Sequence, residues 1–194
     1  RTGAGLRRTF GKIITELADK DENIFVMVGD IGYRVFDDFR EKHPDRFINM
    51  GICEQSIIGV SAGMALEGLK PWVYTITPFL IERPFEQVKL DIDQQNVDVK
   101  LVGFADYPKL GPTHSELSAE KLMALFPNIT SYFPTDGDQT QSMMSEAYEK
   151  NGPVFISLKS VIDLLDIFLG SVIVILLCAT CVLFRVFTIV KLTG

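Results

Sequence analysis

The sequence contains little cysteine and no excess of basic residues. Its three cysteines, Cys53, Cys178 and Cys181, are too few for the disulfide framework of a small secreted protein, so we expect a reducing, cytoplasmic environment. A net charge of −6 excludes the basic footprint of a nucleic-acid-binding domain, and no nucleic-acid partner is expected. Residues 1–5 lack a long apolar run, so no secretory signal is expected at this end.

The usual phosphate-binding motifs are also missing. Gly29-Asp30-Ile31-Gly32 follows an apolar run, but it has neither the spacing of a dinucleotide-binding fingerprint nor that of a Walker loop. The chain is 47% apolar and 23% charged, which is typical of a soluble domain with an ample core. Its 194 residues suit one α/β domain with a short appendage.

The hydrophobic periodicity indicates alternating helices and strands. Apolar residues recur at helical spacing over residues 6–19, and a helix that begins at Glu54 is expected to end near Glu67. This alternation, with short turns, predicts an α/β fold: a doubly wound, mainly parallel sheet of about six strands with helices on both faces. Short β-rich runs predict strands at 24–28, 47–50, 72–75, 99–104, 129–133 and 154–158, and further helices are expected at 35–41, 79–88, 116–126 and up to Tyr148.

The stretch from Asn49 to Gln55 joins a predicted strand to a predicted helix. Such a unit places a side chain at the carboxyl edge of a parallel sheet, where ligands bind in open α/β folds. For Glu54 the residues alone leave two interpretations open. It is either an ordinary helix-start carboxylate, stabilised by the helix dipole, or a functional group at the ligand edge. Cys53 beside it is interpreted as a packing residue rather than a reactive thiol.

Four motifs occur along the chain in the order NMGICEQ, TPFLIERPFEQV, GPTH and PTDGDQ. Together they resemble the pyrimidine-binding domain of the transketolase family of thiamine diphosphate enzymes, from about Leu6 to Lys159. The resemblance implies a domain at residues 1–160 that binds thiamine diphosphate against a diphosphate-binding partner chain, as the C-terminal subunit of a split transketolase. It also implies transfer of a two-carbon ketol unit between ketose- and aldose-type substrates. The Mg²⁺ ligands are implied on the partner, so no metal ligand is expected in this chain.

The resemblance also assigns roles to individual residues. Glu54 is implied to hydrogen-bond a ring nitrogen of the aminopyrimidine, where a shared proton lets the cofactor's own amino group remove the thiazolium proton. Phe79 is implied to stack on that ring, and Phe85 to complete the wall. Asp30 falls where relatives carry an Asp close to the cofactor. The alternative for the two aromatic residues is ordinary helix core, because they lie near one face of a single predicted helix.

His114 and Arg83 are the candidate substrate-binding residues. The His of the transketolase G-P-T-H motif touches substrate and intermediate, so His114 is implied to be catalytic as well, and an imidazole suits proton transfer at working pH. Arg83 lies within the second motif. The alternative for the His114 region is a helix cap formed by Thr113 or Ser115. The other histidine, His43, is interpreted as a solvated turn residue.

Differences from sugar-phosphate transketolases leave the substrate open. Leu110 stands where those enzymes usually carry an Asp, the loop at 105–110 is shorter, and their additional His is absent near Ala105. A 2-oxo acid dehydrogenase β-subunit and a deoxyxylulose-phosphate synthase-like half-enzyme are alternatives of the same class, although the second and third motifs favour transketolase. A non-catalytic, membrane-tethered assembly module is the alternative of a different class.

Residues 161–194 differ in composition from the rest of the chain. Residues 167–184 are uncharged and strongly apolar, and as a helix they would span about 27 Å, enough for a bilayer core. Three interpretations stay open: a transmembrane anchor, a buried helix, or non-native sequence. Arg185 and Lys191 would place the C-terminal end of an anchor inside and the domain outside, away from the cofactor. Membrane association is therefore expected only if this segment is a true anchor.

Overall fold

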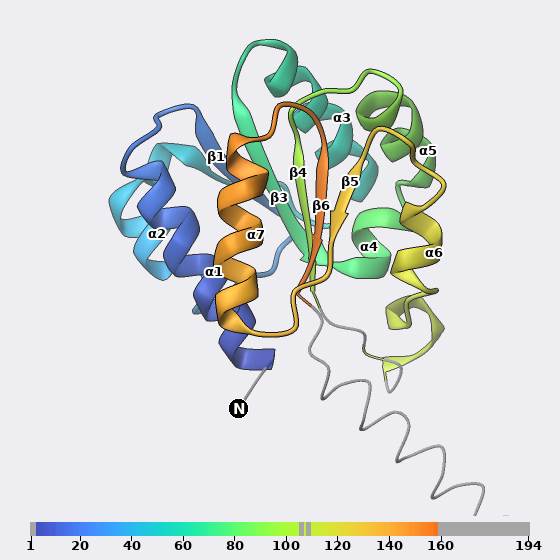
Figure 1. Ribbon diagram of the computed structural model, residues 1–194, viewed down its shortest axis with the longest axis horizontal. Helices are drawn as coiled ribbons and strands as arrows, with labels where there is room; N and C mark the ends of the chain where they lie inside the picture. Colours follow the sequence, from blue (N-terminus) through green and yellow to red (C-terminus); the bar gives the residue numbers. More distant parts are fainter. Residues whose placement is uncertain (1–2, 105–106, 108–109, 159–194) are drawn as a thin grey trace, which may run out of the picture. The chain divides into compact units, whose positions relative to one another are not determined.

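The structure is a computed structural model and describes residues 3–104, 107 and 110–158 (Figure 1). The domain boundary predicted at 160 and the hydrophobic helix predicted within 167–184 lie outside these residues, and both stay predictions. Within the described ranges, no helix combines the length and the apolar character that are needed to cross a membrane.

Strands and helices alternate along the described chain. The strands are β1 (Ile24–Val28), β2 (Phe47–Asn49), β3 (Lys70–Ile76), β4 (Lys100–Phe104), β5 (Thr130–Tyr132) and β6 (Val154–Ser157). The helices are α1 (Gly3–Ala18), α2 (Asp37–Lys42), α3 (Glu54–Leu66), α4 (Thr77–Ile81), α5 (Phe85–Gln87), α6 (Ala119–Met123) and α7 (Gly137–Glu149). Two 3₁₀ turns are η1 (Pro44–Arg46) and η4 (Pro112–His114), and η2 (Val88–Asp93) is a π-helical segment that directly follows α5.

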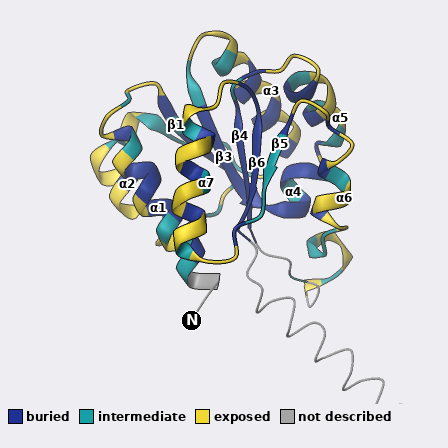
Figure 2. Ribbon diagram, in the orientation of Figure 1, coloured by how far each residue is buried: buried dark blue, intermediate teal, exposed yellow. Residues whose placement is uncertain are grey.

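The strands pair in parallel in the order β2-β1-β3-β4-β6-β5, which confirms the predicted α/β sheet. Residues of α1, α2 and α7 form a core cluster on one face, and residues of α3, α4 and α6 form a second cluster on the other. Figure 1 shows α1 and α7 in front of the strands, and Figure 2 shows that the central strands between the helical layers are buried. The loops that follow these strands share one edge of the sheet, where ligands bind in such folds.

The central strands are apolar on both faces. Every residue of β3 after Lys70 is buried, and so is every residue of β4. Along β3, Trp72 and Tyr74 point into the cluster that contains α1, while Val73 points into the cluster that contains α3. Burial of one such side chain contributes about 1.5–3 kcal/mol. A continuous apolar run, rather than an alternating one, is therefore what this sheet requires.

The single helix predicted over 79–88 is wrong. α4 ends at Ile81, the chain turns through 82–84, and α5 begins at Phe85. Pro84 has no backbone N–H and disfavours helical backbone in Arg83, so it interrupts the helix. As a consequence, Phe79 and Phe85 do not share a helical face, and they pack against different core clusters.

The helix predicted over 116–126 is shorter than expected. It covers Ala119–Met123 and begins after Ser118, whose hydroxyl accepts a hydrogen bond from the Lys121 N–H at 3.4 Å. A Ser in this position satisfies one of the unpaired N–H groups of the first helical turn. The predicted cap at Thr113 or Ser115 is therefore wrong.

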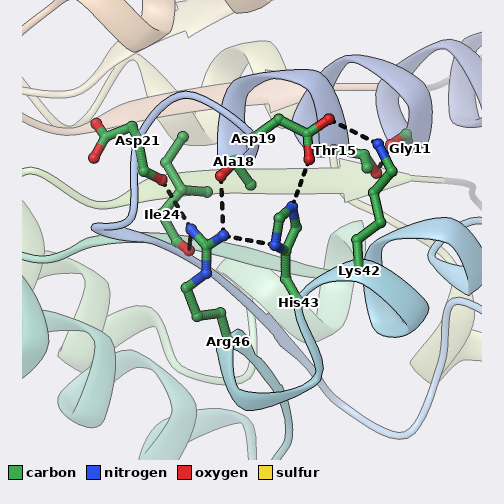
Figure 3. A network of polar contacts seen from close by, with 9 residues as sticks. All are labelled: Gly11, Thr15, Ala18, Asp19, Asp21, Ile24, Lys42, His43 and Arg46. Carbon is green, nitrogen blue, oxygen red and sulfur yellow. Dashed lines mark hydrogen bonds and ion pairs between the residues drawn. The ribbon is translucent and has the colours of Figure 1, made fainter.

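A polar network fastens the chain before β2 to the end of α1 (Figure 3). Arg46 donates hydrogen bonds to the carbonyl oxygens of Ala18 and Asp21, each at 2.9 Å, which satisfies carbonyls at the helix end. His43 bridges Arg46 at 2.7 Å and Asp19 at 2.9 Å. The His43 side chain is only 13% exposed, so its interpretation as a solvated turn residue is wrong. The network holds the strand that leads to the predicted ligand edge.

Gly103 of β4 lets α4 begin close to the sheet. A β-carbon at Gly103 would lie 2.7 Å from the hydroxyl oxygen of Thr77 and 3.3 Å from a ring carbon of Phe155. Thr77 is the first residue of α4 and is fully buried. A larger residue at 103 would therefore push away the helix that carries Phe79.

We expect Gly103→Ala to lower the free energy of unfolding by about 1–3 kcal/mol, because the added methyl group overpacks the contact between β4 and α4. Gly63→Ala is the matched control, because a β-carbon at Gly63, inside α3, meets nothing within 4 Å. The control should raise stability by about 0.5–1 kcal/mol. Urea unfolding measures both variants, and wild-type stability of Gly103→Ala would contradict the close approach.

Candidate cofactor-binding site

Glu54 lies at the carboxyl edge of the sheet as the first residue of α3. The turn before it contains Gly51, whose φ of +74° lies in the left-handed region that glycine adopts at low cost. The Cys53 thiol donates a hydrogen bond to the Met50 carbonyl oxygen at 2.8 Å, which supports the same turn. Glu54 is only 8% exposed. The local sequence therefore presents a largely buried carboxylate at the edge where ligands bind.

The Arg83 guanidinium joins two of the predicted site residues. Its Nη1 lies 2.7 Å from Oε1 of Glu54, and its Cζ lies 3.5 Å from the ring centroid of Phe79. The Glu54 side chain is 10% exposed and the Arg83 side chain 34%, so the ion pair is partly shielded from water. A cation over an aromatic ring contributes about 0.5–1 kcal/mol when exposed and more when desolvated. Arg83 thus couples the carboxylate to the aromatic ring.

His114 packs against the same aromatic ring from the loop before α6. The ring centroids of His114 and Phe79 are 4.9 Å apart, and the ring planes meet at 68°. Oγ1 of Thr113 lies 3.0 Å from Nδ1 of His114 and helps to orient the imidazole. Together with the Arg83 contacts, this places Glu54 and His114 at the two ends of one continuous line of contacts. We call this group the Glu54–His114 line.

Phe85 and Asp30 have other contacts. The Phe85 ring packs against the ring of Phe126, with centroids 5.2 Å apart. Asp30 follows β1, and its Oδ1 accepts a hydrogen bond from the side-chain amide of Asn49 at 3.2 Å. The predicted cofactor contacts of both residues stay predictions.

Sequence reasoning misses two polar residues that bridge distant segments at this edge. Oε1 of Glu82 accepts a hydrogen bond from the Leu117 N–H at 2.7 Å, which fastens the loop after His114 to the turn between α4 and α5. Asn49 bridges the loops that follow β1 and β2. Both residues lie inside the motifs, but a motif does not show which of its polar residues reach across the fold.

The family pattern "Transketolase, pyrimidine binding domain" matches residues 3–160. This chain belongs to that family. The chain spans half or less of the length of the first curated relatives that it matches, at 44%, 50% and 40%. Membership confirms the resemblance on which the roles of Glu54 and His114 are predicted.

Two relatives and one solved structure illustrate the similarity. An apulose-4-phosphate transketolase subunit of Actinobacillus succinogenes is 38% identical over 123 residues, which cover 62% of this chain and 40% of that protein. The 6-deoxy-6-sulfo-D-fructose transketolase subunit SqwH of a Clostridium species is 31% identical over 159 residues, which cover 79% and 49%. A split gene transketolase, solved as an inactive beta4 tetramer, is 32% identical with a TM-score of 0.72, covering 79% of this chain and 51% of that chain.

The contact between Arg83 and Phe79 predicts an energetic coupling. Arg83→Gln and Phe79→Leu should each destabilise the chain, and the double variant should lose about 0.5–1 kcal/mol less than their sum, because either change removes the same contact. Urea unfolding of the four proteins measures this coupling. Phe133→Leu combined with Arg83→Gln is the control, because Phe133 follows the outermost strand β5 and packs on Phe155. Additive losses are expected for the control pair, and additivity for both pairs would refute the coupling.

Proposed function

We propose that this chain supplies the pyrimidine-binding half of a thiamine diphosphate-dependent, transketolase-like enzyme that transfers a two-carbon ketol unit. The Glu54–His114 line carries the proposal, because it sets a carboxyl group, an aromatic ring and an imidazole side by side at the ligand edge. Family membership supports the class of cofactor.

The residues at this edge fit the aminopyrimidine of thiamine diphosphate. Phe79 is half-buried and already carries a planar guanidinium at 3.5 Å, so one face of its ring accepts a flat polar group. Arg83 pairs with Oε1 of Glu54, which leaves the second carboxylate oxygen for a ring nitrogen. When bound, thiamine diphosphate supplies a carbon nucleophile for a carbonyl group and stabilises the negative charge that forms there.

Glu54 is assigned the proton exchange with the ring nitrogen. A carboxyl group can give and take back a proton, whereas an amide in its place would hold only a fixed hydrogen bond. The burial of Glu54 keeps water from competing for that contact. Arg83 beside it offers a planar, permanently charged group that suits substrate oxygens.

His114 is assigned proton transfer at a substrate oxygen. An imidazole changes its protonation state near neutral pH, which suits a residue that must both give and take a proton. Contact with the Phe79 ring, and with Thr113 at Nδ1, restrains the imidazole. The arrangement leaves Nε2 for the substrate.

The remaining parts of the enzyme are assigned to a diphosphate-binding partner chain in a homo- or hetero-oligomer. The family resemblance assigns Mg²⁺ and the diphosphate to that partner. Among the described residues, no group of three or more His, Cys, Asp and Glu side chains is arranged to hold a metal ion. The two relatives are named for different sugars, so we propose only a ketose- or aldose-type substrate. We propose a cytoplasmic enzyme, associated with a membrane only if 167–184 is an anchor.

Glu54→Gln should lower the turnover of the assembled enzyme by about 10²–10⁴-fold, because the amide cannot exchange a proton. Cofactor affinity should change much less, since Gln keeps a hydrogen bond. Glu67→Gln, at the other end of α3, is the matched control and should retain turnover. Steady-state kinetics with a candidate diphosphate-binding partner measure the turnover of both variants. Undiminished turnover of Glu54→Gln would refute the proposed mechanism.

Phe79→Ala should weaken cofactor binding by about tenfold, because it removes the stacking surface. Calorimetric titration with thiamine diphosphate and Mg²⁺, with and without the partner chain, measures the affinity. Phe133→Ala removes a ring next to the outer strand β5 and should leave the affinity unchanged. If the wild-type chain binds no cofactor with any diphosphate-domain partner, this result would favour the alternative of a non-catalytic assembly module.

A further inference from the structure

We propose that Asn49 is a positioning residue that fixes Asp30 and the Gly51 turn at the cofactor-binding edge. Asn49 is the last residue of β2 and lies opposite Val28 of β1, so its side chain reaches the loop that follows β1. The role of Asn49 in cofactor binding rests on the proposed function. Its contacts rest on the geometry of the chain alone.

The Asn49 side chain links two separate loops by hydrogen bonds. Its Oδ1 accepts from the backbone N–H groups of Asp30 and Gly51, each at 3.0 Å, and its Nδ2 donates to Oδ1 of Asp30 at 3.2 Å. We call these contacts the Asn49 clamp. A β-carbon added at Gly29 would lie 3.5 Å from the Gly51 carbonyl oxygen, which shows that the two loops run close together. The clamp therefore sets how the loops after β1 and β2 lie against each other.

The clamp requires an amide at position 49. Two backbone N–H groups converge on one atom of the Asn49 side chain, and only an oxygen can accept from both. The other atom then faces the carboxylate of Asp30, where a donor is needed. A carboxylate at position 49 would still accept from the N–H groups but would place a second negative charge against Asp30.

The clamp acts on two residues with left-handed backbone conformations. Asp30 has a φ of +55° and Gly51 a φ of +74°, both in the left-handed region. Asp adopts this region at some cost and glycine adopts it freely. The residue type at positions 30 and 51 therefore does not by itself fix the backbone conformation. The hydrogen bonds from Asn49 to their N–H groups add a restraint at both positions. Because Glu54 follows Gly51 by one short turn, a shift of that turn moves the carboxylate, and small displacements of such groups reduce rates strongly.

A double-mutant cycle between positions 49 and 30 tests the proposal. Asn49→Asp should weaken thiamine diphosphate binding by the assembled enzyme about tenfold while residue 30 is Asp. In the Asp30→Asn background the same change should alter the affinity less than about twofold, because the amide at position 30 then donates to the carboxylate at 49. Calorimetric titration with thiamine diphosphate and Mg²⁺ measures all four proteins. Asn151→Asp, an exposed site before β6 at the opposite edge, is the matched control.

Hydrogen exchange of the Asp30 and Gly51 amides in the chain alone gives a readout that needs no cofactor. Exchange at both amides should accelerate about tenfold in Asn49→Asp and return towards the wild-type rate in the double variant. Equal effects of Asn49→Asp in both backgrounds would overturn the clamp. Coupled exchange without cofactor binding by the wild type would support the clamp and refute the proposed function. Coupled exchange with undiminished cofactor affinity in Asn49→Asp would overturn the positioning role.

Discussion

The parallel pairing of the central strands is the constraint on which the candidate site depends. β1 pairs with both β2 and β3, and β3 pairs with β4, all in one direction. The strand ends therefore bring together loops that are far apart in the sequence. No local interaction would place Asp30 near Asn49, or Glu54 near the turn after α4. The Arg46 network and the small residue at Gly103 serve this arrangement, because one fixes the entry to β2 and the other lets α4 approach β4.

The turn between helices α4 and α5 separates the two aromatic residues of the second motif. Phe79 lies before this turn, and its ring contacts the side chains of both Arg83 and His114. Phe85 lies after the turn and packs on Phe126 at the core cluster that contains α3. Phe79 therefore contacts two other predicted site residues, whereas Phe85 is partly buried against the core cluster that contains α3.

The sequence predicts the sheet well, because its strands are short apolar runs bounded by turns. The run at 24–28 matches β1, and the helix start at Glu54 is right, since strand, turn and helix follow one another without ambiguity. The failures have physical causes. Pro84 interrupts a pattern whose apolar spacing is helical, and Ser118 competes with Thr113 and Ser115 for one cap. Residues such as His43 and Asn49 act through partners that only the fold brings near, so periodicity does not reveal them.

The position of Arg83 bears on how the site is prepared for a ligand. Its guanidinium is flat, charged, stacked on Phe79 and hydrogen-bonded to Glu54, which are the contacts that the resemblance assigns to an aminopyrimidine. Two flat groups cannot occupy the same face of one ring, so a cofactor that stacks on this face of Phe79 would require Arg83 to move away from it. The Arg83 side chain is 34% exposed and lies in a turn between two short helices, so its displacement breaks little packing. In this structure the pair keeps the charge of a largely buried carboxylate compensated and holds that carboxylate in one position, which is what a preorganised site needs.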